Sequence, residues 1–191
     1  MKRHTFSLVE LLVAMGVLSI LGLILIQFTR DSYSIYLKGQ INSTIHDESS
    51  SVTSRLANGL RGAYQVQSAT NTTLTTLTYF APADVTPTKI TIQQAGSVVN
   101  LTIIQGVVAG NSYVFDPASA ITKSVTTHFV SNPTVPLFKY YDESNTLLAN
   151  PPAVSAIHLI EVTSTVFSQI DTTKTAQSAT KVQLRNLKTN L

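Results

Sequence analysis

The sequence contains no cysteine and has few charged residues. Without cysteine, disulfides, thiol chemistry and cysteine-based metal sites are all excluded, so stability must come from the core and from neighbouring molecules. Charged residues make up 12% of the 191 positions, against about 25% in an average soluble domain. The net charge is only +3 and the basic residues are scattered, so the charge pattern predicts no nucleic-acid partner. The length allows one globular domain plus an appendage.

Proline is also absent until Pro82, and Phe6–Phe28 is apolar apart from Ser7, Glu10, Ser19, Gln27 and the glycines. As a helix, Phe6–Phe28 would extend roughly 33 Å, enough to cross a bilayer core of about 30 Å. Lys2 and Arg3 precede this run. By the positive-inside rule they hold the first residues in the cytoplasm and send the chain after about residue 30 outward. The sequence therefore predicts a single-pass protein of the cytoplasmic membrane with an extracytoplasmic domain.

Three interpretations of this apolar segment compete. A cleaved secretory signal needs a small-residue site after its core, whereas Gln27-Phe28-Thr29-Arg30 follows here. An ordinary uncleaved anchor leaves Glu10 without a purpose, at a cost on the order of a few kcal/mol within the apolar segment. An acid in the first helical turn also interacts favourably with the helix dipole, which is the simplest account of Glu10.

The third interpretation gives Glu10 a partner. The stretch from Thr5 to Leu12, with sequence TFSLVELL, resembles the class III signal of type IV pilins and pseudopilins. The resemblance implies that a prepilin peptidase cleaves between Thr5 and Phe6 and that Phe6 is then N-methylated. It also implies that Glu10 meets the terminal amine of a neighbouring subunit during assembly. The residue before the cut is usually glycine in this family and is Thr5 here, so cleavage at this bond is a hypothesis.

After the apolar run, an apolar stripe with helical spacing continues. It comprises Tyr33, Leu37, Ile41, Ile45, Val52, Leu56, Leu60 and Ala63. We predict one helix over about residues 6–62, with Gly62 as a candidate C-cap. The alternative is two helices joined by a hinge near residues 28–34. The serine run 49–51 is a further place where the helix is predicted to be weak.

From Ala69 onward, Thr, Val and Ile alternate in short runs separated by Gly, Asn and Pro. Residues 89–105 predict a hairpin about Gly96. The fold class is therefore α+β, with a long helix packed on an antiparallel sheet domain in a lollipop-shaped subunit. We expect a leader at 1–5, a membrane or filament-core helix at 6–28, its amphipathic continuation at 29–64 and a β-rich domain at 65–191. The predicted strands are 74–80, 89–94, 98–105, 112–115, 126–131, 137–142, 156–166 and 180–185.

A second resemblance concerns the strands. Pro136–Asp142 (PLFKYYD), Ala156–Val162 (AIHLIEV) and Thr180–Leu187 (TKVQLRNL) are similar, in order and spacing, to strands of J-type pseudopilins and related minor pilins. Arg55-Leu56 and Leu60–Ala63 resemble the end of their long helix. This resemblance implies a minor subunit that primes assembly or sits near the filament tip. We interpret Arg185 and Asn186 as structural residues of the last strand.

No pattern predicts catalysis. The four histidines, His4, His46, His128 and His158, are far apart in sequence, and no G-x-S-x-G motif is present. The loop Asp142–Asn145 has oxygen ligands that suit calcium, but a solvated turn between strands is the preferred interpretation. We therefore expect neither an enzyme nor a cofactor.

The predicted function is that of a structural subunit of a type IV pilus-like or type II secretion filament; the same resemblance covers competence systems. The implied partners are other pilins, the prepilin peptidase, an assembly ATPase acting through a platform protein, and membrane lipid along residues 6–28. The alternative is a membrane-tethered binding module, either an adhesin or a DNA-uptake receptor, with no role in a filament.

Overall fold

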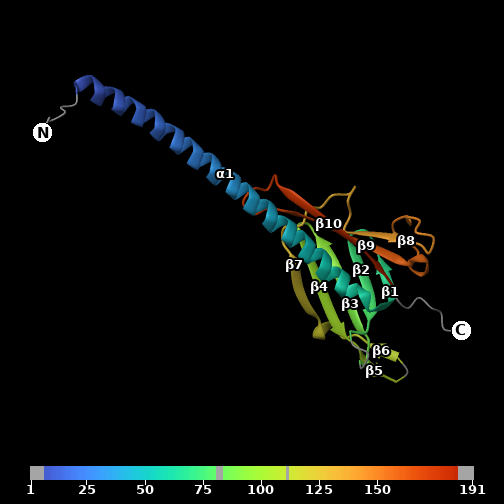
Figure 1. Ribbon diagram of the computed structural model, residues 1–191. Coiled ribbons are helices and arrows are strands. Elements are labelled where there is room, and N and C mark those ends of the chain that lie inside the picture. The colour runs from blue at the N-terminus through green and yellow to red at the C-terminus, as the bar shows by residue number, and fades with distance from the viewer. Residues whose placement is uncertain (1–6, 81–83, 111, 185–191) are drawn as a thin grey trace. The chain divides into compact units, whose positions relative to one another are not determined.

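The computed structural model describes residues 7–80, 84–110 and 112–184. Its contacts divide the chain into two units, Met1–Asn42 and Ser43–Leu191. A single helix, α1 (Leu8–Arg61), contributes to both units (Figure 1). The prediction of one long helix is confirmed, and no hinge interrupts it between residues 28 and 34.

From Leu11 to Phe28, α1 carries apolar side chains around its circumference. Every large apolar side chain from Leu8 to Phe28 is at least half exposed. The most apolar 18-residue window has a mean hydropathy of 2.6, and this is the one helix of the described chain that is long and apolar enough to cross a membrane. Tyr33 and Leu37 are also exposed, at 63% and 38%. The predicted stripe is therefore buried only from Ile45 onward.

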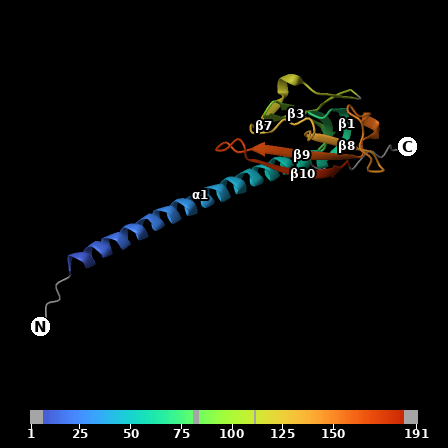
Figure 2. The same ribbon diagram turned by 90° about the horizontal axis from the view of Figure 1, so that it is seen from above.

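Within its described residues, the second unit contains ten antiparallel strands. Five of them form a sheet in the order β1-β2-β3-β4-β7, three form a sheet in the order β10-β9-β8, and β5 pairs with β6 (Figures 1 and 2). Their bounds are β1 (Ala63–Ala69), β2 (Thr73–Thr78), β3 (Thr88–Ala95), β4 (Val98–Gln105), β5 (Val107–Ala109), β6 (Ser112–Val114), β7 (Ile121–Thr126), β8 (Phe138–Tyr141), β9 (Leu159–Phe167) and β10 (Thr175–Gln183). Two short 3-10 helices, η1 (Pro117–Ser119) and η2 (Val154–Ala156), lie in the connections.

The last four turns of α1 form part of the core together with both larger sheets. Leu56 and Leu60 are fully buried in one apolar cluster with side chains from β3, β8 and β9. The other members of this cluster include Ile90, Ile92, Phe138, Tyr140, Ile160 and Val162. At about 1.5–3 kcal/mol for each large side chain removed from water, this cluster supplies the main stabilisation of a domain that has no disulfide.

A polar seam accompanies the apolar core where α1 meets the three-stranded sheet. The buried Ser49 hydroxyl donates to the carbonyl oxygen of Ser164 at 2.8 Å. Thr53 donates to the carbonyl of Ser49 at 3.0 Å and lies 3.3 Å from that of Ser178. The serine run was predicted to weaken the helix; instead Ser49 gives the helix a hydrogen bond to β9, because a short side chain lets the two backbones approach.

Several strand predictions were wrong in position. β1 begins two residues after α1 ends, where no strand was expected, and β7 (Ile121–Thr126) ends where a strand was expected to begin. β5 was also missed, and β10 begins at Thr175 rather than Thr180. The Gly96 hairpin is confirmed, with β3 paired to β4 and a left-handed Gly96 (φ 62°) in the turn. Arg185 and Asn186 lie outside the described residues.

Gly62 has a different role from the predicted C-cap. Among the described glycines, only Gly96 and Gly110 have positive φ, so Gly62 does not adopt the left-handed conformation of such a cap. A Cβ at this position would lie 2.6 Å from Thr78 Oγ1 and 2.7 Å from the carbonyl oxygen of Tyr79. Gly62 therefore permits the close approach of the chain leaving α1 to the end of β2.

We predict that Gly62→Ala lowers the free energy of unfolding by about 1–3 kcal/mol, because the new methyl group overlaps the Tyr79 backbone. Gly59→Ala is the matched control: its Cβ meets only Ile90 Cδ1 at 3.9 Å, and helical alanine gains about 0.5–1 kcal/mol over glycine. Denaturant unfolding of the full chain in detergent micelles measures both. Equal stability of the two variants would contradict this account of Gly62.

Candidate functional site

The start of α1 is closed by a reciprocal pair of hydrogen bonds between Ser7 and Glu10. The Ser7 amide donates to Glu10 Oε2 at 2.9 Å, and the Glu10 amide donates to Ser7 Oγ at 3.2 Å. The Leu11 amide donates to the Ser7 carbonyl at 3.2 Å, which makes Ser7 the residue that precedes the first helical turn. This arrangement is a capping box, and it satisfies amide groups that a helix start otherwise leaves unpaired.

The capping box fixes where the Glu10 carboxylate lies. It turns back toward the chain start, within 2.9 Å of the Ser7 nitrogen, which is covalently bonded to the Phe6 carbonyl carbon. Thr5 and Phe6 themselves lie outside the described residues. The charge of Glu10 is thus held next to the bond that links Ser7 to the preceding residue.

The surroundings of Glu10 along the helix are apolar. Leu8, Val9, Leu11 and Leu12 are 60–77% exposed, and no charged residue follows until Arg30. In a membrane or a packed helical bundle, an unpaired carboxylate among such side chains costs on the order of several kcal/mol. A positive group close to the carboxylate would offset this cost.

Ser7 is a functional residue that the sequence analysis missed, although its signal was present. The pattern Ser7-x-x-Glu10 directly before an apolar run is the signature of a capping box. The sequence pattern also places Glu10 in the first helical turn, where an acid interacts favourably with the helix dipole. The structure adds the reciprocal hydrogen bonds that orient its carboxylate.

In the second unit, one glutamate, two lysines and a tyrosine form a cluster on the three-stranded sheet. On the outer side of the three-stranded sheet, Glu161 Oε1 lies 3.8 Å from Lys139 Nζ, and Glu161 Oε2 lies 4.0 Å from Lys181 Nζ. The Tyr141 hydroxyl donates to Glu161 Oε2 at 2.8 Å. Burial, followed by this hydrogen bond to a carboxylate, raises the pKa of Tyr141 to about 12. Each strand of this sheet contributes to the cluster, which ties their register together.

The other candidate residues are dispersed. His46 is exposed on α1, His158 precedes β9, and His128 Nδ1 lies 3.2 Å from Glu48 Oε1. Within the described ranges, no group of three or more His, Asp or Glu residues has a geometry that could hold a metal ion.

The loop after β8 is a tight turn. Asp142 Oδ1 accepts a hydrogen bond from the Thr146 amide at 2.7 Å, and Asn145 has a positive φ of 60°. The Asn145 side-chain oxygen lies 3.4 Å from Lys181 Nζ. Two of the oxygens that suggested calcium, Asp142 Oδ1 and Asn145 Oδ1, therefore already accept hydrogen bonds, one within the turn and one from β10.

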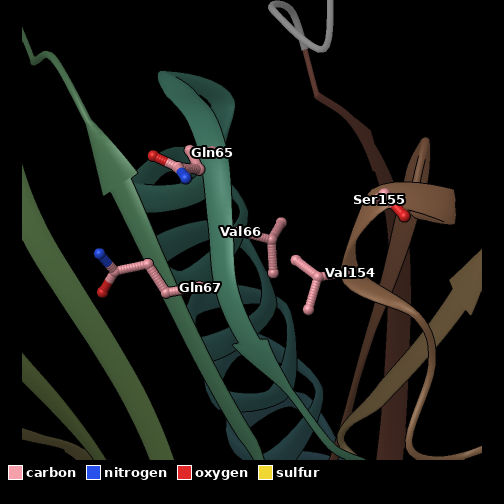
Figure 3. Close-up of a pocket in the computed structure, with 5 residues that line it drawn as sticks. All are labelled: Gln65, Val66, Gln67, Val154 and Ser155. Atoms are coloured by element: carbon pink, nitrogen blue, oxygen red, sulfur yellow. The ribbon is translucent and has the colours of Figure 1, made fainter.

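A shallow pocket lies between β1 and η2. Its lining is Gln65, Val66 and Gln67 of β1 with Val154 and Ser155 of η2, and Val66 and Val154 point toward each other (Figure 3). This lining includes no ionisable side chain, so the pocket provides neither a general base nor a nucleophile activated by one.

Comparison with known proteins gives one positive result. Residues 1–26 match a family model described as the prokaryotic N-terminal methylation motif. Searches of the curated proteins and of the solved structures gave no match. The motif covers Ser7 and Glu10 as well as the predicted cleavage bond. The resemblance of the strands to one subtype has no such support and stays a prediction.

Proposed function

We propose that this chain, whose N-terminal methylation motif supports its place among the type IV pilins and pseudopilins, is a structural subunit of a pilus-like or type II secretion filament. The observation that carries the proposal is a membrane-length helix with an exposed apolar surface and one carboxylate, Glu10, oriented by a capping box at its start. Such a surface suits lipid before assembly and the helices of other subunits afterwards.

Processing supplies the partner for Glu10. In this proposal, a prepilin peptidase cleaves the bond between Thr5 and Phe6, and the new amino group on Phe6 is methylated and remains positively charged. The ammonium group and the Glu10 carboxylate neutralise each other when helices of adjacent subunits pack. Glu10 Oε2 accepts a hydrogen bond from the Ser7 amide. Within the described chain, Oε1 has no hydrogen-bond partner, so it is the natural acceptor for a neighbour's amine.

Charged groups near the start of the chain set both the orientation of the protein in the membrane and the axial register between neighbouring subunits. Lys2 and Arg3 favour a cytoplasmic leader, which places the sheet domain on the extracytoplasmic side of the membrane. Neighbouring subunits that slide along their apolar helices lose little hydrophobic contact, whereas a carboxylate and an amine that miss each other are both left unpaired. The ion pair would therefore select the axial position of each subunit.

The partners follow from this assembly role. They are other pilins or pseudopilins, the prepilin peptidase, and an assembly platform protein that takes subunits from the lipid pool along residues 6–28. The resemblance of the strands to J-type pseudopilins supports a minor subunit that primes assembly or sits near the tip. The chain's own role is structural, since the ionisable clusters of the described chain tie strands together.

Intact-mass analysis of the native protein tests the processing step. We expect a chain that begins at Phe6 and carries one additional methyl group, in both the membrane and the sheared-filament fraction. Substitution of the residue before the cut, Thr5→Gly, should preserve this product, since glycine is usual there. A chain that begins at Met1 in assembled filaments would overturn the proposed cleavage.

Glu10→Gln separates the two roles of Glu10. Glutamine retains the acceptor of a capping box but cannot neutralise an amine. We expect Glu10→Gln and Glu10→Ala alike to abolish recovery of the protein with sheared filaments, while membrane levels and processing stay near wild type. Glu48→Gln, which changes the charge of a residue in the second unit, is the control and should coassemble normally.

If Glu10→Gln coassembles like the wild type, capping alone accounts for this residue and the ion-pair mechanism is wrong. If the wild-type protein itself never copurifies with filaments, the chain is a membrane-tethered module and the filament role is wrong.

A further inference from the structure

The strand β10 (Thr175–Gln183) forms one border of the three-stranded sheet and pairs only with β9 (Figure 2). Its pairing is unbroken over all nine residues, from Thr175 opposite Phe167 to Gln183 opposite Leu159. The other border of this strand has no strand beside it in the described chain. The main-chain groups along that free border are available for pairing with a further strand.

The hydrogen bonds that flank the ladder show which main-chain groups face outward. Just outside the two ends of β10, Ser168 donates to the Lys174 carbonyl at 3.0 Å, and Leu184 donates to the His158 carbonyl at 3.2 Å. Residues in an antiparallel pair face the partner strand alternately. Because residues 174 and 184 face β9, the even-numbered residues between them also face β9. The main-chain groups that point to the free border belong to Thr175, Gln177, Ala179, Lys181 and Gln183.

These five residues present a regular row of donors and acceptors. Each contributes one N–H and one C=O, and all five side chains are exposed. Within residues 7–80, 84–110 and 112–184, no hydrogen bond from another segment reaches these main-chain groups. An unpaired row of this kind is a template for an additional strand.

Along β10, few of the features that normally prevent an edge strand from pairing with another chain are present. The strand contains no proline, its ladder has no bulge, and Lys181 is its only charged residue. By contrast, β1, an edge strand of the five-stranded sheet, carries two register shifts that interrupt its regular row. Folded proteins normally shorten, bend or charge such edges, so an unbroken nine-residue edge favours pairing with a further strand.

A basic pocket lies at the end of this border. It has a volume of about 270 Å³ and is lined by Arg61 together with Lys181, Val182 and Gln183. Arg61 donates to the neutral Asn58 Oδ1 at 2.9 Å, and Lys181 shares the single carboxylate of Glu161 with Lys139. The residues that line the pocket therefore include two cations and no carboxylate. A carboxylate entering beside Arg61 would complete the charge balance.

We propose that the free border of β10 binds an extended segment of a different polypeptide, which adds a fourth strand and places an acidic side chain in the pocket beside Arg61 and Lys181. Main-chain hydrogen bonds to the five outward-facing residues give the affinity, and the carboxylate fixes the register. A second copy of β10 is a poor occupant, because its sequence TAQSATKVQ offers no carboxylate to Arg61.

The test uses the full chain in detergent micelles and two synthetic peptides. Both are nine-residue strands of alternating threonine and valine; one carries a single aspartate near its end and the other asparagine at the same position. We expect the aspartate peptide to slow amide hydrogen exchange about tenfold or more at residues 177, 179, 181 and 183, while the already paired even-numbered amides change little. The asparagine peptide should bind about tenfold more weakly at low salt.

Ala179→Pro removes one outward-facing N–H while leaving the β9 ladder intact, since proline is tolerated where the amide of an edge strand faces solvent. It should abolish peptide binding. Ala179→Val keeps the N–H and should bind like the wild type. Unchanged protection of the even-numbered amides verifies that both variants are folded. Arg61→Gln should remove the preference for the aspartate peptide.

Absence of saturable binding by either peptide, or equal binding by Ala179→Pro, overturns strand addition at this border. Equal binding of the two peptides overturns the claim that an acidic side chain in the pocket fixes the register of the added strand. Protection of the odd-numbered amides that rises with protein concentration and without peptide would instead assign the border to a second copy, against the proposal. The assay involves no filament, so its outcome is independent of the assembly role of Glu10.

Discussion

One carboxylate at the start of an uncovered apolar helix constrains the rest of this molecule. Fifteen large apolar side chains from Leu8 to Phe28 are at least half exposed, and covering such side chains stabilises a structure by about 1.5–3 kcal/mol each. Lipid and protein cover them equally well. In the proposed assembly, a positive group neutralises Glu10, so the carboxylate would distinguish a specific helical neighbour from a bilayer. The Ser7 capping box makes this constraint sharper, because it holds the carboxylate in one direction.

In the second unit, packing and hydrogen bonds hold the C-terminal end of α1 in place without disulfides. Its apolar stripe from Ile45 to Leu60 is buried, and Ser49 and Thr53 reach main-chain carbonyls of the sheet. Outside the core, Glu161 joins the three strands through Lys139, Lys181 and Tyr141. Gly62 allows the chain to pass from helix to strand with almost no connection. These features anchor the C-terminal end of α1 in the sheet domain.

The sequence predicted the long helix, the α+β class and the Gly96 hairpin well, because strong apolar periodicity and a left-handed glycine are local signals. It failed where strands lack such signals. In β10 the only buried residues are Ala176 and Val182, so the Thr, Gln and Ser between them resembled a loop. β1 was missed because it follows α1 without a linker, and Gly62 was mistaken for a cap because close approach to Tyr79 is a tertiary property. The capping role of Ser7 could have been predicted from the Ser7-x-x-Glu10 pattern, but the direction of the Glu10 carboxylate could be established only from the structure.

The central claim, that Glu10 meets the amino terminus of a neighbouring subunit, can be tested most directly by photo-crosslinking. A benzoylphenylalanine replacing Val9, next to Glu10, is irradiated in cells that assemble filaments, and the sheared-filament fraction is digested and analysed by mass spectrometry. The account predicts crosslinked peptides that join residue 9 to the N-terminal segment of a second pilin-like subunit, and their loss in Glu10→Gln. Adducts with lipid alone, or crosslinks that persist unchanged in Glu10→Gln, would contradict it.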